Sequence, residues 1–88
     1  MELKDKKIVV VGLGKSGEST AKLLKNLDAE VLVLEQKPLQ EVSAAAQRLE
    51  KIGVQVKAGG YGPADFASAQ LVVLSPGVNE KEKIYLDL

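Results

Sequence analysis

The stretch from Ile8 to Thr20, I-V-V-V-G-L-G-K-S-G-E-S-T, constrains the fold of this chain more than any other. Its four β-branched residues, at positions 8–11, are typical of a parallel strand that is buried on both faces. Glycines at positions 12, 14 and 17 follow at the G-x-G-x-x-G spacing. In this pattern the first glycine lets the chain turn off the strand. The second leaves the backbone open to a ligand, and the third lets a helix pack closely on the sheet.

The helix that should follow this turn offers a position for an anion. Ser16 is the predicted N-cap, because its hydroxyl can accept a hydrogen bond from a free N–H in the first turn. Unpaired N–H groups and about half a positive charge at a helix N-terminus suit a phosphate group. Glycines at this spacing also serve turns that bind nothing. The buried strand before them, the amphipathic helix after them and an acidic residue about 20 positions further on favour a nucleotide or nucleotide-sugar ligand.

The composition limits the chemistry of the chain. Its 88 residues suffice for one small domain. Twelve basic and twelve acidic residues balance, so we expect neither a nucleic-acid partner nor binding to an anionic membrane. The absence of cysteine and histidine excludes a disulfide, a thiolate nucleophile or metal site, and the usual general base near neutral pH. No apolar run approaches the roughly 20 residues of a membrane span, and we expect a cytoplasmic protein.

The rest of the chain predicts alternating helices and strands. Apolar residues at three- and four-residue steps predict helices over 16–27 and 39–52, and Pro63 should open one or two helical turns over 63–69. Buried strands are expected over 30–35 and 69–75, with a half-exposed edge strand over 54–58. Gly53 suits the left-handed residue that ends a helix. The side chains expected to face the core from the helices are Ala21, Leu24, Leu27 (with Leu23 beside them), Val42, Ala45, Ala46, Leu49, Ile52 and Phe66.

The order β-α-β-α-β-(α)-β predicts an α/β fold, a Rossmann-like half with a parallel sheet of strand order 3-2-1-4 and helices on both faces. Ligands of such sheets bind beyond the carboxyl ends of the strands. We therefore expect the glycine turn, the loop after residue 35, and the loops G-G-Y-G-P (59–63) and S-P-G (75–77) to border one crevice. The last two loops would otherwise be ordinary turns.

Glu35 ends the second predicted strand. In dinucleotide-binding folds an acidic residue at this place accepts hydrogen bonds from a ribose. The alternative is a charged strand end that is merely solvated, and the glycine motif upstream favours the ligand contact.

Three of these segments together resemble the N-terminal domain of the Mur ligases. They are V-V-V-G-L-G-K-S-G over 9–17, L-E-Q-K over 34–37 and L-V-V-L-S-P-G-V over 71–78. The resemblance covers residues 3–78 and is greatest to the members that add D-glutamate. S-P-G is the discriminating part, because an ordinary NAD-binding domain has no need of it after the fourth strand.

The resemblance implies that the domain holds the uridine diphosphate part of a UDP-sugar substrate. Residues 14–17 would face the diphosphate through their N–H groups and the hydroxyl at position 16. Residues 35–37 would surround the uracil and ribose, where family members usually carry Asp, Thr or Ser, and Arg. Residues 75–77 would close the other side. The binding residues so implied are Gly14, Lys15, Ser16, Gly17, Glu35, Gln36, Lys37, Ser75, Pro76 and Gly77.

Family members continue into a central domain that binds ATP and a C-terminal domain for the incoming amino acid. This chain contains no G-x-x-x-x-G-K-[ST] loop, so the resemblance implies one substrate-binding domain over 1–88, cut from a longer ligase and not catalytic alone. Residues 79–88 fit the family pattern poorly. The implied parent reaction uses ATP and Mg to form an acyl phosphate on the substrate carboxyl, which D-glutamate captures during peptidoglycan precursor synthesis. The remaining ligase domains are the expected partners.

Two other functions stay open at the level of sequence. The same glycines and Glu35 would suit NAD, although S-P-G would then be unexplained and no residue here serves hydride chemistry. The chain would otherwise be a structural module without a ligand. In that case the exposed edge of the strand over 69–75 would favour self-association.

Overall fold

The computed structural model describes residues 2–75. The expectations for Pro76, Gly77 and the tail over 79–88 lie outside this part of the chain. The strands are β1 (Lys7–Val11), β2 (Glu30–Glu35), β3 (Gln55–Ala58) and β4 (Leu71–Leu74); the helices are α1 (Lys15–Asn26), α2 (Leu39–Lys51) and the 3₁₀-helix η1 (Pro63–Phe66).

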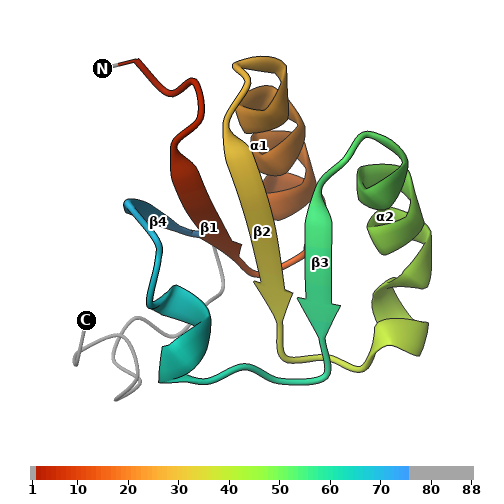
Figure 1. Ribbon diagram of the computed structural model, residues 1–88. Helices are drawn as coiled ribbons and strands as arrows, with labels where there is room; N and C mark the ends of the chain where they lie inside the picture. The colour runs from red at the N-terminus through yellow and green to blue at the C-terminus, as the bar shows by residue number, and fades with distance from the viewer. Residues whose placement is uncertain (1, 76–88) are drawn as a thin grey trace.

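The four strands form one sheet in the order β3-β2-β1-β4, and every pair is parallel, as the sequence predicts. β1 lies inside the sheet, where Val10 is paired with Val33 of β2 on one side and with Val73 of β4 on the other. This position explains the uninterrupted run of β-branched residues. The glycine turn at the end of β1 therefore lies between the ends of β2 and β4 (Figure 1).

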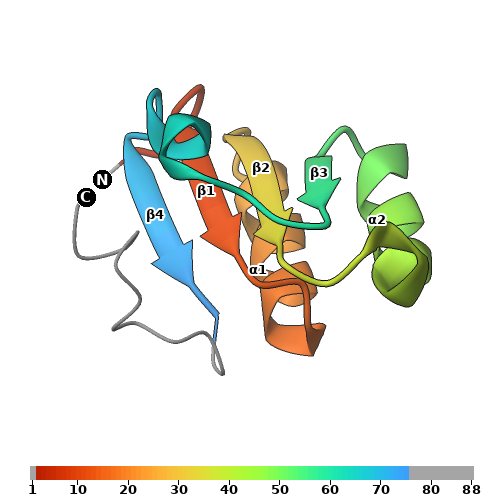
Figure 2. The same cartoon turned by 90° about the horizontal axis from the view of Figure 1, so that it is seen from below.

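The sheet separates two apolar clusters. Figure 2 shows α1 and α2 on one side of it and η1 on the other. The first cluster joins the buried faces of both helices to alternate residues of β1 and β2, and the second joins Phe66 of η1 to Val9, Val11 and Leu34. The predicted fold class is thus confirmed, and within residues 2–75 the helix on the second face is the 3₁₀-helix η1. Within residues 2–75 no helix is long and apolar enough to span a membrane.

Helix α1 has its N-cap two residues earlier than the sequence suggested. Its N-cap is Gly14, whose extended backbone (φ −101°, ψ −167°) leads directly into the helix and whose carbonyl accepts the N–H of Glu18 at 2.9 Å. Ser16 is consequently the second residue of the helix, and no side chain of the described residues caps this end. The predicted N-cap role of Ser16 is wrong, because the glycine itself makes the turn into the helix.

The last apolar residue of each predicted α-helix lies outside the helix and does not face the core. Leu27 and Ile52 are the C-caps of α1 and α2 and are 47% and 42% exposed, so the expectation that they face the core is wrong. The next turns, with positive φ at Asp28 (65°) and at Gly53 (91°), lead the chain away from each helix. The left-handed role of Gly53 is confirmed. Leu23, one residue from buried Leu24, is 59% exposed.

Strand β4 is half-buried rather than buried. It is an edge strand of the sheet, paired only with β1 among the described residues, and the sparse cover of the second face leaves it partly accessible. β3, at the opposite edge, alternates between exposed and half-buried residues as predicted. Pro63 begins η1 and Phe66 is its buried anchor, as the sequence indicated.

Candidate functional site

The glycine turn brings α1 against the sheet. Gly12 has φ 98°, a backbone conformation that favours glycine, and it turns the chain off β1. A Cβ on Gly17 would lie 1.9 Å from the carbonyl oxygen of Gly12, so any side chain there would push the helix away from the turn. The predicted roles of Gly12 and Gly17 in the turn are confirmed.

Gly14 has a different environment. A Cβ built on it would meet no atom within 4 Å, and Gly14, Lys15 and Ser16 are all exposed. Because no side chain among residues 2–75 caps α1, the first N–H groups of the helix are left for an acceptor from outside this part of the chain. The carboxyl ends of the strands and the positive end of the helix dipole meet here, which is an arrangement suited to a phosphate.

The carboxylate of Glu35 is held by backbone N–H groups on both oxygens. Its Oε1 accepts the N–H of Leu13 at 2.7 Å, and its Oε2 accepts the N–H of Lys37 at 2.9 Å. The half-buried side chain therefore joins the loop after β2 to the glycine turn after β1. The sequence indicated a ligand contact or simple solvation for Glu35, and it carries no local signal for this third role.

Ser75 contacts the glycine turn from the opposite side. Its side chain is buried, with 9% of the residue exposed, and Oγ donates a hydrogen bond to the carbonyl of Gly12 at 3.0 Å. Its N–H bonds the carbonyl of Val11 at 2.9 Å, so the residue continues the pairing of β4 with β1. Of the segment S-P-G, the serine is thus placed directly beside the glycine motif.

The predicted loops meet at the carboxyl ends of the strands only in part. The N–H groups of Gly59 and Gly60 donate to the carbonyls of Lys37 (2.8 Å) and Glu35 (3.1 Å), which joins the third loop to the second. Gln36 and Lys37 are exposed. A groove of about 320 Å³ lies between the start of α1 and α2. Of the eight predicted binding residues that lie within residues 2–75, only Gly14 and Lys15 line it. The other described residues that line it are Leu13, Glu18, Glu41, Val42, Ser43, Ala44, Ala45 and Arg48.

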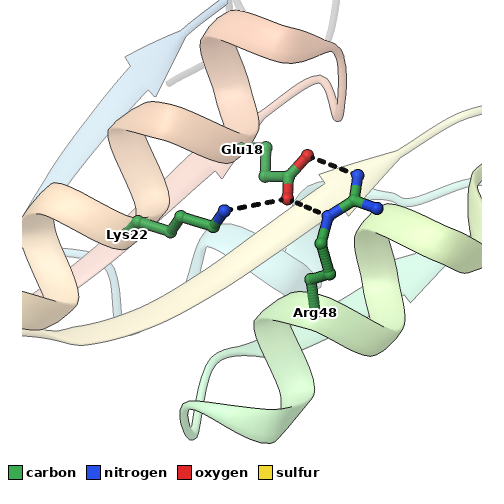
Figure 3. Close-up of polar contacts among 3 residues, drawn as sticks. All are labelled: Glu18, Lys22 and Arg48. Carbon is green, nitrogen blue, oxygen red and sulfur yellow. Dashed lines mark hydrogen bonds and ion pairs between the residues drawn. The ribbon is translucent and has the colours of Figure 1, made fainter.

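An ion network joins the two α-helices at this groove (Figure 3). Arg48 of α2 donates to both carboxylate oxygens of Glu18 of α1, from Nε at 2.6 Å and from Nη2 at 2.9 Å. The Nζ of Lys22 lies 3.3 Å from the same carboxylate. Arg48 lies 30 residues from Glu18 in the chain, and only the packing of α1 beside α2 shows that the two residues pair. The sequence carries no local pattern that indicates this pair.

We expect the Glu18–Arg48 pair to make stability depend on pH. Chiefly the hydrogen bonds from Arg48, with Lys22 helping and partial burial opposing, lower the pKa of Glu18 from 4.5 to about 2. Because the folded-state pKa is lowered, the contribution is complete above pH 4.5 and is lost as the pH falls toward 2. Glu18→Gln should reduce the free energy of unfolding by about 1 kcal/mol at pH 7 and by progressively less below pH 4.5.

Urea unfolding of the wild type and Glu18→Gln across this pH range measures the difference directly. Glu50→Gln, a neutralised exposed residue of α2, is the matched control and should behave as the wild type. Asp65 also has a lowered pKa, owing first to the N–H of Gly62 and then to Lys57. Protonation of Asp65 therefore lowers the stability of the wild type and of both variants alike in acid. A difference between Glu18→Gln and wild type that is unchanged down to pH 2 would contradict the assignment.

Comparison with known families agrees with this geometry. The family model described as the Mur ligase MurD-like, N-terminal domain matches residues 6–86. A UDP-N-acetylmuramoylalanine–D-glutamate ligase of Bdellovibrio bacteriovorus is 42% identical over 84 residues, which is 96% of this chain and 18% of that protein. The enzyme of the same name from Acidobacterium capsulatum is 44% identical over 78 residues, or 89% of this chain and 17% of that protein. The chain thus spans about a fifth of the length of these relatives.

Solved structures with the same arrangement of strands include two dehydrogenases. A precorrin-2 dehydrogenase superposes with a TM-score of 0.72 at 24% identity, over 89% of this chain and 38% of that one. The D-lactate dehydrogenase from Escherichia coli superposes with a TM-score of 0.66 at 25% identity, over 92% of this chain and 22% of that one. These likenesses show a Rossmann-like fold and no more. The family match identifies the family, and it includes the glycine turn, the end of β2 and the end of β4. The chain therefore belongs to the MurD-like family of Mur ligase N-terminal domains.

Proposed function

We propose that this domain binds the uridine diphosphate part of UDP-N-acetylmuramoyl-L-alanine, as the substrate-binding domain of a D-glutamate-adding ligase. The observation that carries the proposal is the uncapped start of α1, with Gly14 open to solvent, in a member of the MurD-like family. A helix end of this kind offers several N–H groups and a positive potential to a diphosphate. The names of the relatives, which specify a UDP-sugar, support the same ligand class.

In this proposal the diphosphate lies against residues 14–17, and the uracil and ribose lie beside residues 35–37. Lys37 is exposed at the end of β2, where its ammonium group would add to the positive potential of the helix end. Residues 75–77 would border the opposite side of the ligand. The carboxylate of Glu35 and the hydroxyl of Ser75 already bond the glycine turn, so their expected effect on the ligand includes the shape of that turn.

The proposal for the parent protein includes steps that this domain does not perform. An ATP- and Mg-dependent ligase of this kind activates the substrate carboxyl as an acyl phosphate, which D-glutamate then captures. Domains other than this one would supply the ATP and amino-acid sites and would be its partners. Substrates such as ATP and a nucleotide sugar imply a cytoplasmic location and a role in peptidoglycan synthesis. The contribution of this chain is to hold one end of the substrate.

An NMR titration of the chain with UDP, and separately with NAD at equal concentration, tests the ligand. We expect amide shifts at residues 14–17 and 35–37 with UDP and none with NAD. The family match favours UDP over NAD, because it is to a Mur ligase N-terminal domain rather than to a dinucleotide-binding domain. Shifts with NAD alone would replace the proposal by a dinucleotide-binding function. The absence of shifts with both would indicate a structural module whose site needs the rest of the ligase.

Substitution of the residues expected to contact the ligand should weaken UDP binding. Lys37→Ala removes a cation and Ser16→Ala removes a hydroxyl, and we expect each change to raise the Kd for UDP about tenfold, since hydrogen bonds to charged groups contribute about that factor. Isothermal titration calorimetry measures both constants. Lys51→Ala and Ser68→Ala, which change exposed residues outside the predicted site, are matched controls. Unchanged UDP affinity in Lys37→Ala and Ser16→Ala would remove these two residues from the site.

We also expect the isolated chain to self-associate through β4. Among the described residues this strand pairs with β1 on one side only, and all four of its residues are half-buried. An unpaired edge with apolar side chains is a template for another strand. Sedimentation velocity over a wide range of concentration should show a mass that increases with concentration. A constant monomer mass would contradict this expectation without affecting the proposed ligand.

A further inference from the structure

One peptide unit in the glycine turn is bonded at both of its polar atoms by side chains. The carbonyl of Gly12 accepts the hydroxyl of Ser75 at 3.0 Å, and the N–H of Leu13 donates to the carboxylate of Glu35 at 2.7 Å. The two polar atoms belong to the single peptide that joins Gly12 to Leu13. They point in opposite directions in a trans peptide, here toward β4 and toward β2.

The preceding peptide is oriented in the same way, but by backbone groups. The carbonyl of Val11 accepts the N–H of Ser75 at 2.9 Å, and the N–H of Gly12 donates to the carbonyl of Leu34 at 2.7 Å. Successive peptides of a regular strand face opposite ways, and the positive φ of Gly12 (98°) accompanies the departure from that pattern. The side chains of Glu35, the last residue of β2, and of Ser75, the residue after β4, therefore extend the hydrogen bonding of the sheet by one peptide beyond the end of β1.

We propose that Glu35 and Ser75 are positioning residues, which together hold the Gly12–Leu13 peptide in one orientation and so set where the first turn of α1 presents its N–H groups. The carbonyl of this peptide lies directly against Gly17 in that turn. A rotation of the peptide would therefore displace the start of the helix as well as the loop. The effect on UDP rests on the proposed function, whereas the effect on the peptide does not.

The length of the Glu35 side chain and the hydrogen-bonding groups of Glu35 and Ser75 suit them to hold this peptide. A carboxylate accepts hydrogen bonds at both oxygens, which suits two N–H groups, those of Leu13 and Lys37. Glu35→Asp keeps the charge but withdraws the carboxylate by one methylene group, out of reach of the Leu13 N–H. Glu35→Gln keeps the length but turns an NH₂ group toward one of the two donors. Ser75→Ala removes the only donor that the Gly12 carbonyl has within residues 2–75.

Hydrogen exchange of single amides in the ligand-free chain tests the orientation of the peptide. We expect Leu13 to exchange about tenfold faster or more in Glu35→Asp, the factor that a hydrogen bond to a charged group contributes, and less so in Glu35→Gln. Ser75→Ala should also increase the exchange rate of the Leu13 amide, although Ser75 bonds the carbonyl at the other end of the peptide. The same variant should shift the carbonyl resonance of Gly12. The amide of Val10, in the core of the sheet, reports global unfolding and should keep a higher protection than Leu13 in each variant.

Two matched controls use the same substitutions elsewhere. Glu30→Asp changes the exposed residue at the opposite end of β2, and Ser68→Ala changes an exposed serine before β4, and neither should alter the exchange of Leu13. The double variant Glu35→Asp/Ser75→Ala should increase the exchange rate of the Leu13 amide by less than the product of the two single increases, because both hydrogen bonds hold the same peptide. If Glu35→Asp does not fold, Glu35→Gln and Ser75→Ala carry the same test.

Titration with UDP then separates positioning from direct contact. We expect the Kd for UDP to rise in the same order as the exchange rate of Leu13 across the variants. If UDP affinity falls while the exchange of Leu13 in the free chain stays at the wild-type rate, the two residues act on the ligand itself and the inference is wrong. Unchanged Leu13 exchange with unchanged affinity would overturn it equally. If UDP does not bind the wild type but the exchange rate of the Leu13 amide changes in the variants as expected, Glu35 and Ser75 do orient the peptide. The proposed function is then wrong.

Discussion

Gly17→Ala is expected to be the most damaging single substitution in this chain, lowering the free energy of unfolding by about 3 kcal/mol or more. The added Cβ would lie 1.9 Å from the carbonyl oxygen of Gly12 and 2.9 Å from the hydroxyl of Ser75. The first of these neighbours is backbone, held by β1, so the whole start of α1 would have to move. For a domain of this size the loss is a large part of the total stability. Urea unfolding followed by circular dichroism measures it.

Gly14→Ala is the matched control, since it makes the same change three residues earlier in the same turn. A Cβ on Gly14 meets no atom within 4 Å, and its φ of −101° is accessible to alanine. We expect its stability to stay within about 0.5 kcal/mol of the wild type. UDP binding should nevertheless weaken, because the new methyl group would stand between the backbone and the phosphate. Equal stability of the Gly14→Ala and Gly17→Ala variants would contradict the close packing of α1 on the turn.

Phe66→Ala is expected to lower the free energy of unfolding by about 3 kcal/mol. Phe66 is 5% exposed and packs against Val9, Val11 and Leu34 on the face of the sheet that neither α-helix covers. Tyr61 meets its ring edge-on at a centroid distance of 6.1 Å. Because η1 is the only helix on this face among residues 2–75, its truncated anchor would leave a cavity that no neighbouring helix can fill. Thermal and urea unfolding measure the loss.

Two further variants show whether the cost comes from the lost ring. Phe66→Leu keeps most of the buried apolar volume and should cost about 1 kcal/mol. Leu23→Ala removes an apolar side chain that is largely exposed and should change stability by less than about 0.5 kcal/mol. A Phe66→Ala variant as stable as Leu23→Ala would mean that η1 does not contribute to the core.

The fold could be predicted from the sequence because its signals are local and repeat along the chain. The β-branched run over 8–11, the glycine spacing and two amphipathic stretches each indicate their own element, and parallel βαβ units permit few arrangements. Most of the errors fall at the ends of elements, whereas the half-burial of β4 follows from its place at the edge of the sheet. Leu27 and Ile52 continue the apolar period of their helices but lie where the chain leaves the helix, and periodicity carries no information about that departure.

The sequence predicted where the candidate site residues lie in the fold, but not the hydrogen bonds that Glu35 and Ser75 make there. The glycine turn predicted where α1 begins its approach to the sheet, and the strand order placed Glu35 and Ser75 at the neighbouring strand ends. That Glu35 accepts the N–H of Leu13 depends on how far the carboxylate of β2 reaches across the sheet. The binding roles of residues 14–17, 35–37 and 75–77 stay predictions that the UDP titration tests.

The sequence by itself determined the order of elements, the parallel sheet, the close packing at Gly17 and the family to which the chain belongs. These follow from short-range patterns, because the spacing of apolar residues and glycines restricts the backbone over a few residues at a time. Only the tertiary structure decided that Glu18 pairs with Arg48, and that Glu35 and Ser75 hold one peptide between them. Such contacts depend on distances of a few ångströms between residues far apart in the chain, which no local pattern specifies.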